Sequence, residues 1–293
     1  LNQNVPRQPV PNQTVPNQYS PEQLGSNPIK GLDYFCEISK SDDIHIVGHS
    51  QWIKSLLKLY DIQILKGKEY KKIKNQNIYT VKFVYKKKKF YISRHAFTIS
   101  NAFKEKSSIF GNQYQISQIS ELDTGLTLYG ILTCYFLHNN YIFPNKNTIY
   151  VSCLIRTWMT AISIYLPLYI ENKNILNNTI EMNLKVGDYI REKSSSNMIQ
   201  RDNVPDKIDN QETKIKLFIN FYINFLDKFC GEIYNTKDIN IIIKIHINNN
   251  RIIEYNNNIL KNKIYNYFDI KENIDYLQKN SNTFEYLKIN SNS

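Results

Sequence analysis

The chain has few of the residues that crosslink or interrupt a protein, with four cysteines, nine glycines and nine prolines among 293 residues. No two cysteines form a C-x-x-C pair, which excludes a zinc or redox motif, and four are too sparse for a disulfide framework. Sparse, scattered cysteines favour a reducing compartment, so we expect a cytoplasmic protein. The most apolar stretch, residues 162–170, contains Pro167 and is too short to span a membrane.

What is present is a globular composition with a basic balance. Hydrophobic residues make up 42% of the chain and aromatic residues 13%, which excludes a wholly disordered or collagen-like protein. Lysine and arginine number 37 against 26 acidic residues, giving a net charge of +11. Such a charge favours a phosphorylated metabolite, nucleic acid or an acidic membrane surface as partner, and does not choose among them.

Composition shifts divide the chain into three parts. Residues 1–28 are rich in Pro, Gln and Asn, without apolar periodicity, and we expect a disordered tail. Residues 29–235 are expected to form one domain. Residues 236–293 are expected to form a C-terminal appendage, in which INIIIKIHI and RIIEY flank three asparagines and predict a β-hairpin.

Within the domain, the hydrophobic pattern alternates between short strands and helices. Strands are predicted at residues 44–48, 77–85, 90–95 and 147–152, and helices at 31–39, 50–60, 126–137, 155–165 and 215–229, with another from 101 onward. Residues 193–213 are polar and read as irregular. This alternation predicts an α/β three-layer sandwich with a largely parallel central sheet.

Two of these strands end in histidine, at His49 and at Arg94-His95, and each precedes a predicted helix. In open α/β sheets, ligand sites lie beyond the carboxyl ends of the strands. A helix N-terminus adds free N–H groups and positive potential, which suits a phosphate. The sequence therefore predicts that these side chains share one anion-binding crevice.

Several motifs resemble the histidine phosphatase, or phosphoglycerate mutase-like, superfamily. Residues 94–101, RHAFTISN, resemble the signature R-H-G-x-[ST]-x-x-N of that superfamily. Four further elements of the resemblance are Leu126-Thr127-x-x-Gly130, Ser152-x-x-x-Arg156-x-x-x-Thr160-Ala161, Ile190-Arg191-Glu192 and Val47-Gly48-His49-Ser50. Together they cover roughly residues 31–235.

The order of these motifs departs from the family. The element with the second histidine normally comes last, whereas here Val47–Ser50 comes first, followed by NIYTVKFVY, which resembles the strand normally following that histidine. The resemblance therefore implies a circular permutation. Chain termini often lie close together at the surface, where such a rearrangement is tolerated.

The resemblance also implies a role for each residue of the site. His95 would attack phosphorus and form a phosphohistidine, while Arg94 and Arg156 would bind the phosphoryl oxygens. His49 would add a further donor. One branch of the family places its acid directly after the second histidine, but Ser50 and Gln51 stand there, so Glu192 is the candidate that protonates the leaving group. Thr98 and Asn101 are candidate phosphate ligands.

Each residue also has an ordinary structural interpretation. Arg94 and His95 could lie in a solvated loop, Arg156 on a helix surface, Glu192 in a polar loop, and His49 in the core. Thr98 and Asn101 could cap a helix. His45 is expected outside the site, at the other end of its strand, and His138 and His246 at the surface. Ala96 replaces the glycine of the signature and would be strained at positive φ, and Phe97 argues against close kinship with the mutases.

The resemblance implies a metal-independent hydrolase of phosphomonoesters, without cofactor, whose partner is a phosphorylated small molecule or phosphoprotein. One alternative is a non-catalytic phosphate- or phosphoprotein-binding module on the same fold, which the presence of Ala96 favours. A nucleic-acid-binding protein is favoured only by the net charge and is the weakest of the three readings.

Overall fold

A computed structural model describes ten stretches of the chain, and every structural statement below concerns these residues. They are 28–59, 63–64, 80–102, 123–144, 148–172, 178–187, 190, 205–230, 239–247 and 251–260. The expected disordered tail, residues 1–28, lies outside them except for Pro28, which begins the first helix. Proline suits this first helical position because its missing N–H would have no intrahelical partner there.

Eight strands form a single mixed sheet in the order β2-β3-β4-β1-β5-β6-β7-β8. The strands are β1 (Asp43–Gly48), β2 (Gln63–Ile64), β3 (Thr80–Tyr85), β4 (Lys88–Arg94), β5 (Thr148–Val151), β6 (Thr179–Val186), β7 (Asn240–His246) and β8 (Ile252–Asn256). The five central strands, from β4 to β7, run parallel, and β2, β3 and β8 pair antiparallel at the two edges. The predicted largely parallel sheet is therefore confirmed.

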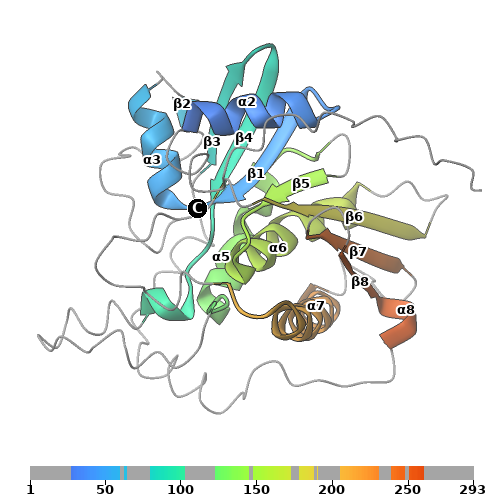
Figure 1. Cartoon of the computed structure of the whole chain (residues 1–293). Helices are drawn as coiled ribbons and strands as arrows, with labels where there is room; N and C mark the ends of the chain where they lie inside the picture. The colour runs from blue at the N-terminus through green and yellow to red at the C-terminus, as the bar shows by residue number, and fades with distance from the viewer. Residues whose placement is uncertain are drawn as a thin grey trace, which may run out of the picture.

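Helices lie on both faces of this sheet (Figure 1). They are α2 (Pro28–Ile38), α3 (Ser50–Leu59), α5 (Leu128–Leu137), the 3-10 turn η3 (His138–Asn140), α6 (Ile155–Glu171), α7 (Ile208–Cys230) and α8 (Asn257–Leu260). One hydrophobic cluster joins α2 and α3 to one face, and a larger one joins α5, α6 and α7 to the other. The α/β class with helices on both faces is thus confirmed.

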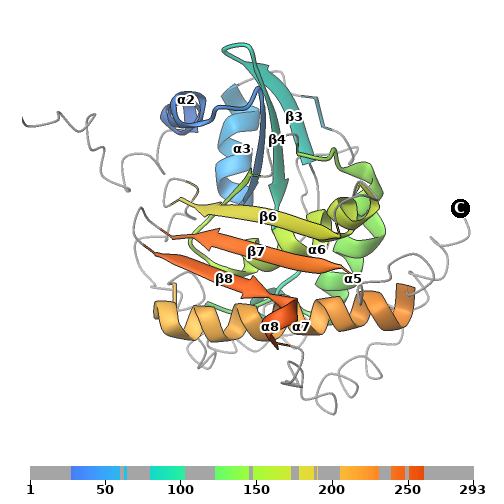
Figure 2. The ribbon, with the colours of Figure 1, turned by 90° about the vertical axis from the view of Figure 1, so that its right-hand side faces the viewer.

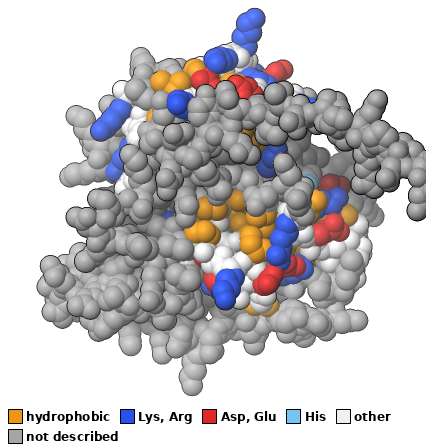
Figure 3. Space-filling model, in the orientation of Figure 1, with side chains coloured by type: hydrophobic (Ala, Val, Ile, Leu, Met, Phe, Trp, Pro, Cys, Tyr) orange, Lys and Arg blue, Asp and Glu red, His pale blue; other side chains and the backbone are white. Residues whose placement is uncertain are grey.

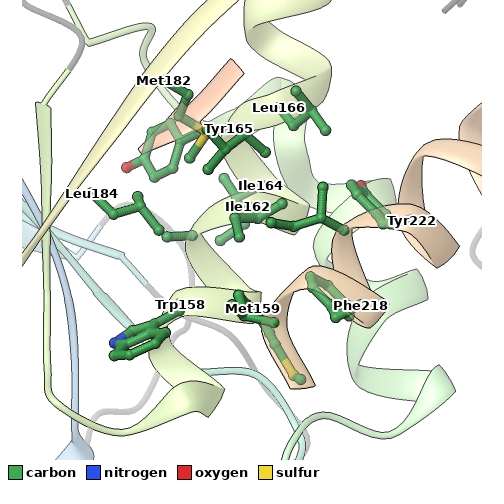
Figure 4. Close-up of a cluster of buried hydrophobic side chains, with 14 of the residues drawn as sticks. Trp158, Met159, Ile162, Ile164, Tyr165, Leu166, Met182, Leu184, Phe218 and Tyr222 are labelled. Carbon is green, nitrogen blue, oxygen red and sulfur yellow. The ribbon is translucent and has the colours of Figure 1, made fainter. Parts of the chain in front are cut away.

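Helix α6 is the centre of the larger cluster (Figure 4). Every residue from Ile155 to Ile170 is buried, because Met182 and Leu184 of β6 pack on one side of the helix and Phe218 and Tyr222 of α7 on another. The helix continues through Pro167 to Glu171, six residues beyond the predicted end. A helix buried all round fixes the position of the residues at its N-terminus.

The sheet is covered on both faces only along part of its width. In β6, β7 and β8 buried and less buried residues alternate. The buried face packs on α6 and α7 (Figure 2), and the less buried positions are mostly polar or charged. The predicted hairpin of the appendage is present as β7 and β8. Because β7 pairs with β6, the sheet runs across the domain boundary expected after residue 235.

The lysine-rich turn joins β3 to β4 as a two-residue hairpin loop. Lys86 and Lys87 have φ angles of 47° and 65°, as a turn with two left-handed central residues requires. Lys86 forms an ion pair with Asp33 of α2 at 2.7 Å.

None of the helices in the described part of the chain is long and apolar enough to cross a membrane.

Candidate active site

The two histidines meet at the carboxyl edge of the sheet. In the parallel pair of β1 and β4, Gly48 lies opposite Arg94, so His49 and His95 leave their strands at the same level. The backbone N–H of His95 donates to the carbonyl of Gly48 at 3.0 Å. The imidazole rings lie 5.2 Å apart between centroids, at 63° to one another. The predicted meeting of His49 and His95 at one edge is therefore observed.

The neighbouring strand β5 and the helix α6 that follows it add two further residues of the quoted motifs, Ser152 and Arg156. Ser152 follows β5, and its hydroxyl lies 2.9 Å from Nε2 of His49. Arg156 is the second residue of α6, and both Arg156 and Arg94 are 3% exposed. Arg156 is thus not a helix-surface arginine, and Arg94 and His95 do not form a solvated loop. The structure brings Arg94, His95, Arg156 and His49 together at one buried location.

The hydrogen bond of His95 determines its tautomer. Nδ1 of His95 lies 2.8 Å from the carbonyl oxygen of Ala96, which can only accept, so Nδ1 carries the proton. Burial, the charges of Arg156 and Arg94 and the neighbouring His49 lower the pKa of His95 well below its usual range. His95 is therefore neutral near pH 7, with a lone pair on Nε2.

His49 is neutral for similar reasons. Burial, followed by the positive charges of Arg156 and Arg94, lowers the pKa of His49 well below its usual range. The two guanidinium groups thus lower the pKa of both histidines. A site with two buried cations beside two neutral imidazoles has a positive potential, which suits a phosphoryl group.

Thr98 and Asn101 cap the helix that follows the Arg94-His95 strand. The Thr98 hydroxyl accepts from the backbone N–H of Asn101 at 3.1 Å and donates to Oδ1 of Asn101 at 2.9 Å. Oδ1 of Asn101 in turn accepts from the backbone N–H of Thr98 at 3.3 Å. This reciprocal arrangement is a capping box, so the capping interpretation describes the observed contacts of both residues.

The loop after His95 is tied to α6 through Ala96. The backbone N–H of Ala96 donates to the Thr160 hydroxyl at 3.0 Å, and that hydroxyl donates to the carbonyl of Arg156 at 2.7 Å. Ala96 is not among the described residues with positive φ, so the backbone strain considered above is absent. Thr160, the threonine of the quoted S-x-x-x-R-x-x-x-T element, thus connects the loop after His95 with the first turn of α6, which carries Arg156.

The quoted L-T-x-x-G element packs on the same loop. Thr127 caps α5 and its hydroxyl donates to the carbonyl of Phe97 at 3.2 Å. A Cβ placed on Gly130 would lie 2.3 Å from that carbonyl oxygen. Only glycine therefore allows α5 to approach the residues after His95 so closely.

Sequence reasoning missed one carboxylate beside the site. Asp123 is fully buried, accepts from the backbone N–H of Ile155 at 2.9 Å, and accepts from the Gln211 side chain. Burial raises the pKa of Asp123 to about 6, against the opposing effects of Gln211 and Arg156. Ile155 lies 32 positions away in sequence, so no local pattern marks this contact. The sequence feature that could have drawn attention to Asp123 is its position three residues before Leu126, where the quoted L-T-x-x-G element begins.

The candidate acid, Glu192, lies outside the described residues. Ile190 of the same element is described and buried, and a Cβ on Gly48 would lie 2.4 Å from Cγ2 of Ile190. Ile190, the first residue of this element, thus packs directly beside the residue that precedes His49. If Glu192 is not the acid, Glu181 and Glu105 are the next candidates, and Glu105 also lies outside the described residues. Glu181 lies elsewhere, on β6, where it is exposed and pairs with Lys244 at 3.1 Å.

The remaining histidines lie away from this site. His45 contacts the Tyr165 hydroxyl at 3.1 Å and stacks on Tyr91, as expected for a residue outside the site. The expectation that His138 is a surface residue is wrong, because it is 4% exposed and lies 2.9 Å from Glu171 at the end of α6.

In the described part of the chain, no three His, Cys, Asp or Glu side chains are grouped so that they could hold a metal ion. Comparisons with protein-family models, with curated proteins and with solved structures found no match to this chain. The functional argument therefore rests on the geometry of the site.

Proposed function

We propose that the chain belongs to the class of phosphoryl-transfer proteins that use histidine as the nucleophile. The observation that carries this proposal is the 5.2 Å approach of the His49 and His95 rings at the carboxyl edge of the sheet, beside Arg94 and Arg156. More particularly, we propose a phosphomonoester hydrolase of the histidine phosphatase type with a circularly permuted chain. The place of β1 supports the permutation, because the first strand in sequence lies between β4 and β5.

In the first chemical step, the Nε2 lone pair of His95 attacks phosphorus and the bond from phosphorus to the ester oxygen breaks. Nδ1 keeps its proton and donates it in a hydrogen bond to the carbonyl of Ala96, which keeps Nε2 nucleophilic and lets the ring carry positive charge. Arg94 and Arg156 stabilise the charge on the three phosphoryl oxygens. An acid, for which Glu192 is the candidate, gives its proton to the departing oxygen.

In the second step, water attacks the phosphohistidine and the bond between nitrogen and phosphorus breaks. The carboxylate left on Glu192 takes the proton of that water, and inorganic phosphate and neutral His95 result. The choice of Glu192 comes from the resemblance of residues 190–192 to the family element, and the first of these residues, Ile190, packs against Gly48 next to His49.

A panel of alkyl and aryl phosphomonoesters, tested on the full chain with excess chelator, examines this function. We expect turnover by the wild type and none by His95→Ala. His246→Ala is the matched control, because His246 is half-buried on β7 and contacts Asn183 away from the site, and it should retain turnover. Absence of turnover on every ester, despite binding of phosphate, would contradict the enzymatic proposal.

The second candidate function is a phosphate-binding module. It is favoured by Asp123, the described carboxylate beside Arg156, because both of its oxygens already accept hydrogen bonds. Such a carboxylate cannot readily protonate a leaving group.

Nucleic-acid binding has less support, because acidic and basic side chains are mixed on the described surface in Figure 3. On the open sheet face, Lys244 pairs with Glu181 rather than joining a basic stripe.

A further inference from the structure

Asp123 connects three separate parts of the chain at one buried carboxylate. Oδ1 accepts from the backbone N–H of Ile155, the first residue of α6, and Oδ2 accepts from Nε2 of Gln211 in α7. The backbone N–H of Asp206, just before α7, also bonds to this carboxylate. Gln211 donates as well to the carbonyl of Cys153 at 3.0 Å, in the turn between β5 and α6.

The contact with Ile155 supplies a cap that α6 otherwise lacks. Leu154 occupies the N-cap position and its side chain makes no capping hydrogen bond. The first N–H groups of a helix have no intrahelical partner, so a carboxylate there satisfies a donor and complements the helix dipole. Asp123 thereby fixes the first turn of α6, in which Arg156 directly follows Ile155.

The segment that begins with Asp123 is also fixed to the loop after His95. The backbone N–H of Ile99 donates to the carbonyl of Gly125 and that of Thr127 donates to the carbonyl of Phe97, both at 3.1 Å. Asp123 itself has a φ of 54°, a left-handed conformation that aspartate tolerates better than most residues but that the surroundings must hold in place. The segment that begins with Asp123 thus contacts the His95 loop through its backbone and the first turn of α6 through the Asp123 side chain.

We propose that Asp123 is a positioning residue of the site: with Gln211, it holds the first turn of α6 against the His95 loop and so sets Arg156 for contact with a phosphoryl group. This inference deepens the proposed function and rests on it for the role of Arg156. Asp123 itself need not touch the phosphoryl group, since it acts through the backbone of Ile155.

Binding of inorganic phosphate to the full chain, measured by calorimetry, tests this inference without requiring turnover. Asp123→Ala should weaken phosphate binding by about tenfold, as expected when a hydrogen bond to a charged group is misaligned. In an Arg156→Lys background, Asp123→Ala should cause little further loss, because the contact it serves is already impaired. Gln211→Ala keeps the carboxylate and should give a smaller loss with the same dependence on Arg156.

Asp209→Ala is the matched control. Asp209 lies in the first turn of α7, two residues from Gln211, and pairs with Arg251 at the surface, so phosphate binding should be unchanged. The inference is overturned if folded Asp123→Ala binds phosphate like the wild type, or if its effect is the same with and without Arg156. Should Asp123→Ala not fold, unaltered binding by Gln211→Ala overturns it equally.

A wild type that shows no phosphate binding also overturns the inference. A wild type that turns over no ester, yet binds phosphate in a manner dependent on Asp123 and Arg156, refutes only the hydrolase. The two failures are therefore distinguishable.

Discussion

At the scale of single residues, the site is built from side chains that already have structural partners. Thr160 accepts from the backbone N–H of Ala96 and donates to the carbonyl of Arg156, so one hydroxyl links the backbone next to His95 with helix α6. His95 is oriented by the carbonyl of its own neighbour, Ala96. Orientation is thus provided before any ligand is bound, which is what preorganised transfer of a charged group requires.

Replacing Thr160 by valine tests this link. Thr160→Val keeps the shape but leaves the buried N–H of Ala96 without its acceptor, so unfolding free energy should fall by about 1–3 kcal/mol. Thr213→Val is the matched control, because the exposed Thr213 makes only the same bond to the carbonyl four residues earlier. Its cost in urea unfolding should stay within about 0.5 kcal/mol. Equal effects of the two substitutions would show that the bond to Ala96 contributes nothing.

The proposed role of Glu192 as the acid is tested by comparing substrates with poor and good leaving groups. Glu192→Gln should slow hydrolysis of alkyl phosphates strongly, because their leaving oxygens need a proton, and should slow the phosphorylation step for aryl phosphates much less. Rates measured on both kinds of ester check this expectation. Small and equal effects would remove Glu192 from the mechanism.

At the scale of elements, close approach of helix and loop is the main constraint. Gly130→Ala places a methyl group against the backbone of Phe97, so we expect a loss of about 1–3 kcal/mol in unfolding free energy. Gly31→Ala is the matched substitution in α2, where the nearest atom to the added Cβ belongs to the Trp52 side chain and lies 3.6 Å away. It should be neutral or stabilise by up to about 1 kcal/mol, since alanine favours helix more than glycine. Urea unfolding that ranks the two variants in the opposite order would contradict this packing.

The elements that lead into the site could be predicted because each has a clear local pattern. Strands β1, β4 and β5 are short apolar runs, and helices follow two of them directly. Strand β6 was missed although TIEMNLKV alternates, and α7 begins seven residues before its predicted start at Ile215. Its polar first turn reads as a loop, and the bonds of Asp206 to Lys207 and Asn210 that begin the helix are not visible in hydrophobic spacing.

The site could be predicted only where a residue belongs to a motif or ends a strand. His49, Arg94, His95 and Arg156 satisfy this condition. Asp123 and Gln211 do not, because their contacts join segments 88 positions apart and depend on how α7 packs. The burial of His138 was missed for the same reason, since its partner Glu171 lies at the far end of another helix.

At the scale of the whole molecule, three buried histidines couple stability to pH. Burial lowers the pKa of His45 to about 4, and the pKa values of His49 and His95 lie well below the ordinary 6.5. Below about pH 6.5 the unfolded chain binds protons that the folded chain does not, so stability falls as the pH drops. Asp123 has the opposite effect. Its pKa is raised to about 6, so the folded chain binds this proton before the unfolded chain does, and its contribution to stability rises as the pH falls from about 6 to 3.8. It is one group against three.

We therefore expect the unfolding free energy from urea titrations to be lower near pH 5 than near pH 7.5, by a few kcal/mol. His45→Phe removes one of the three titrating groups without touching the site, so its loss between these two pH values should be smaller. Stability that is constant, or that rises toward acid, would contradict the neutral state assigned to these histidines.

The central claim is that His95 carries the phosphoryl group during turnover. A phosphoramidate is labile in acid and comparatively stable in base, unlike a phosphoserine ester, so rapidly quenched protein can be analysed by peptide mapping after reaction with a labelled phosphomonoester. We predict acid-labile phosphate on the peptide that contains His95, with both label and turnover lost in His95→Ala. Wild-type protein that binds phosphate at this site, yet neither acquires label nor turns over any phosphomonoester, would contradict the claim and favour a phosphate-binding module.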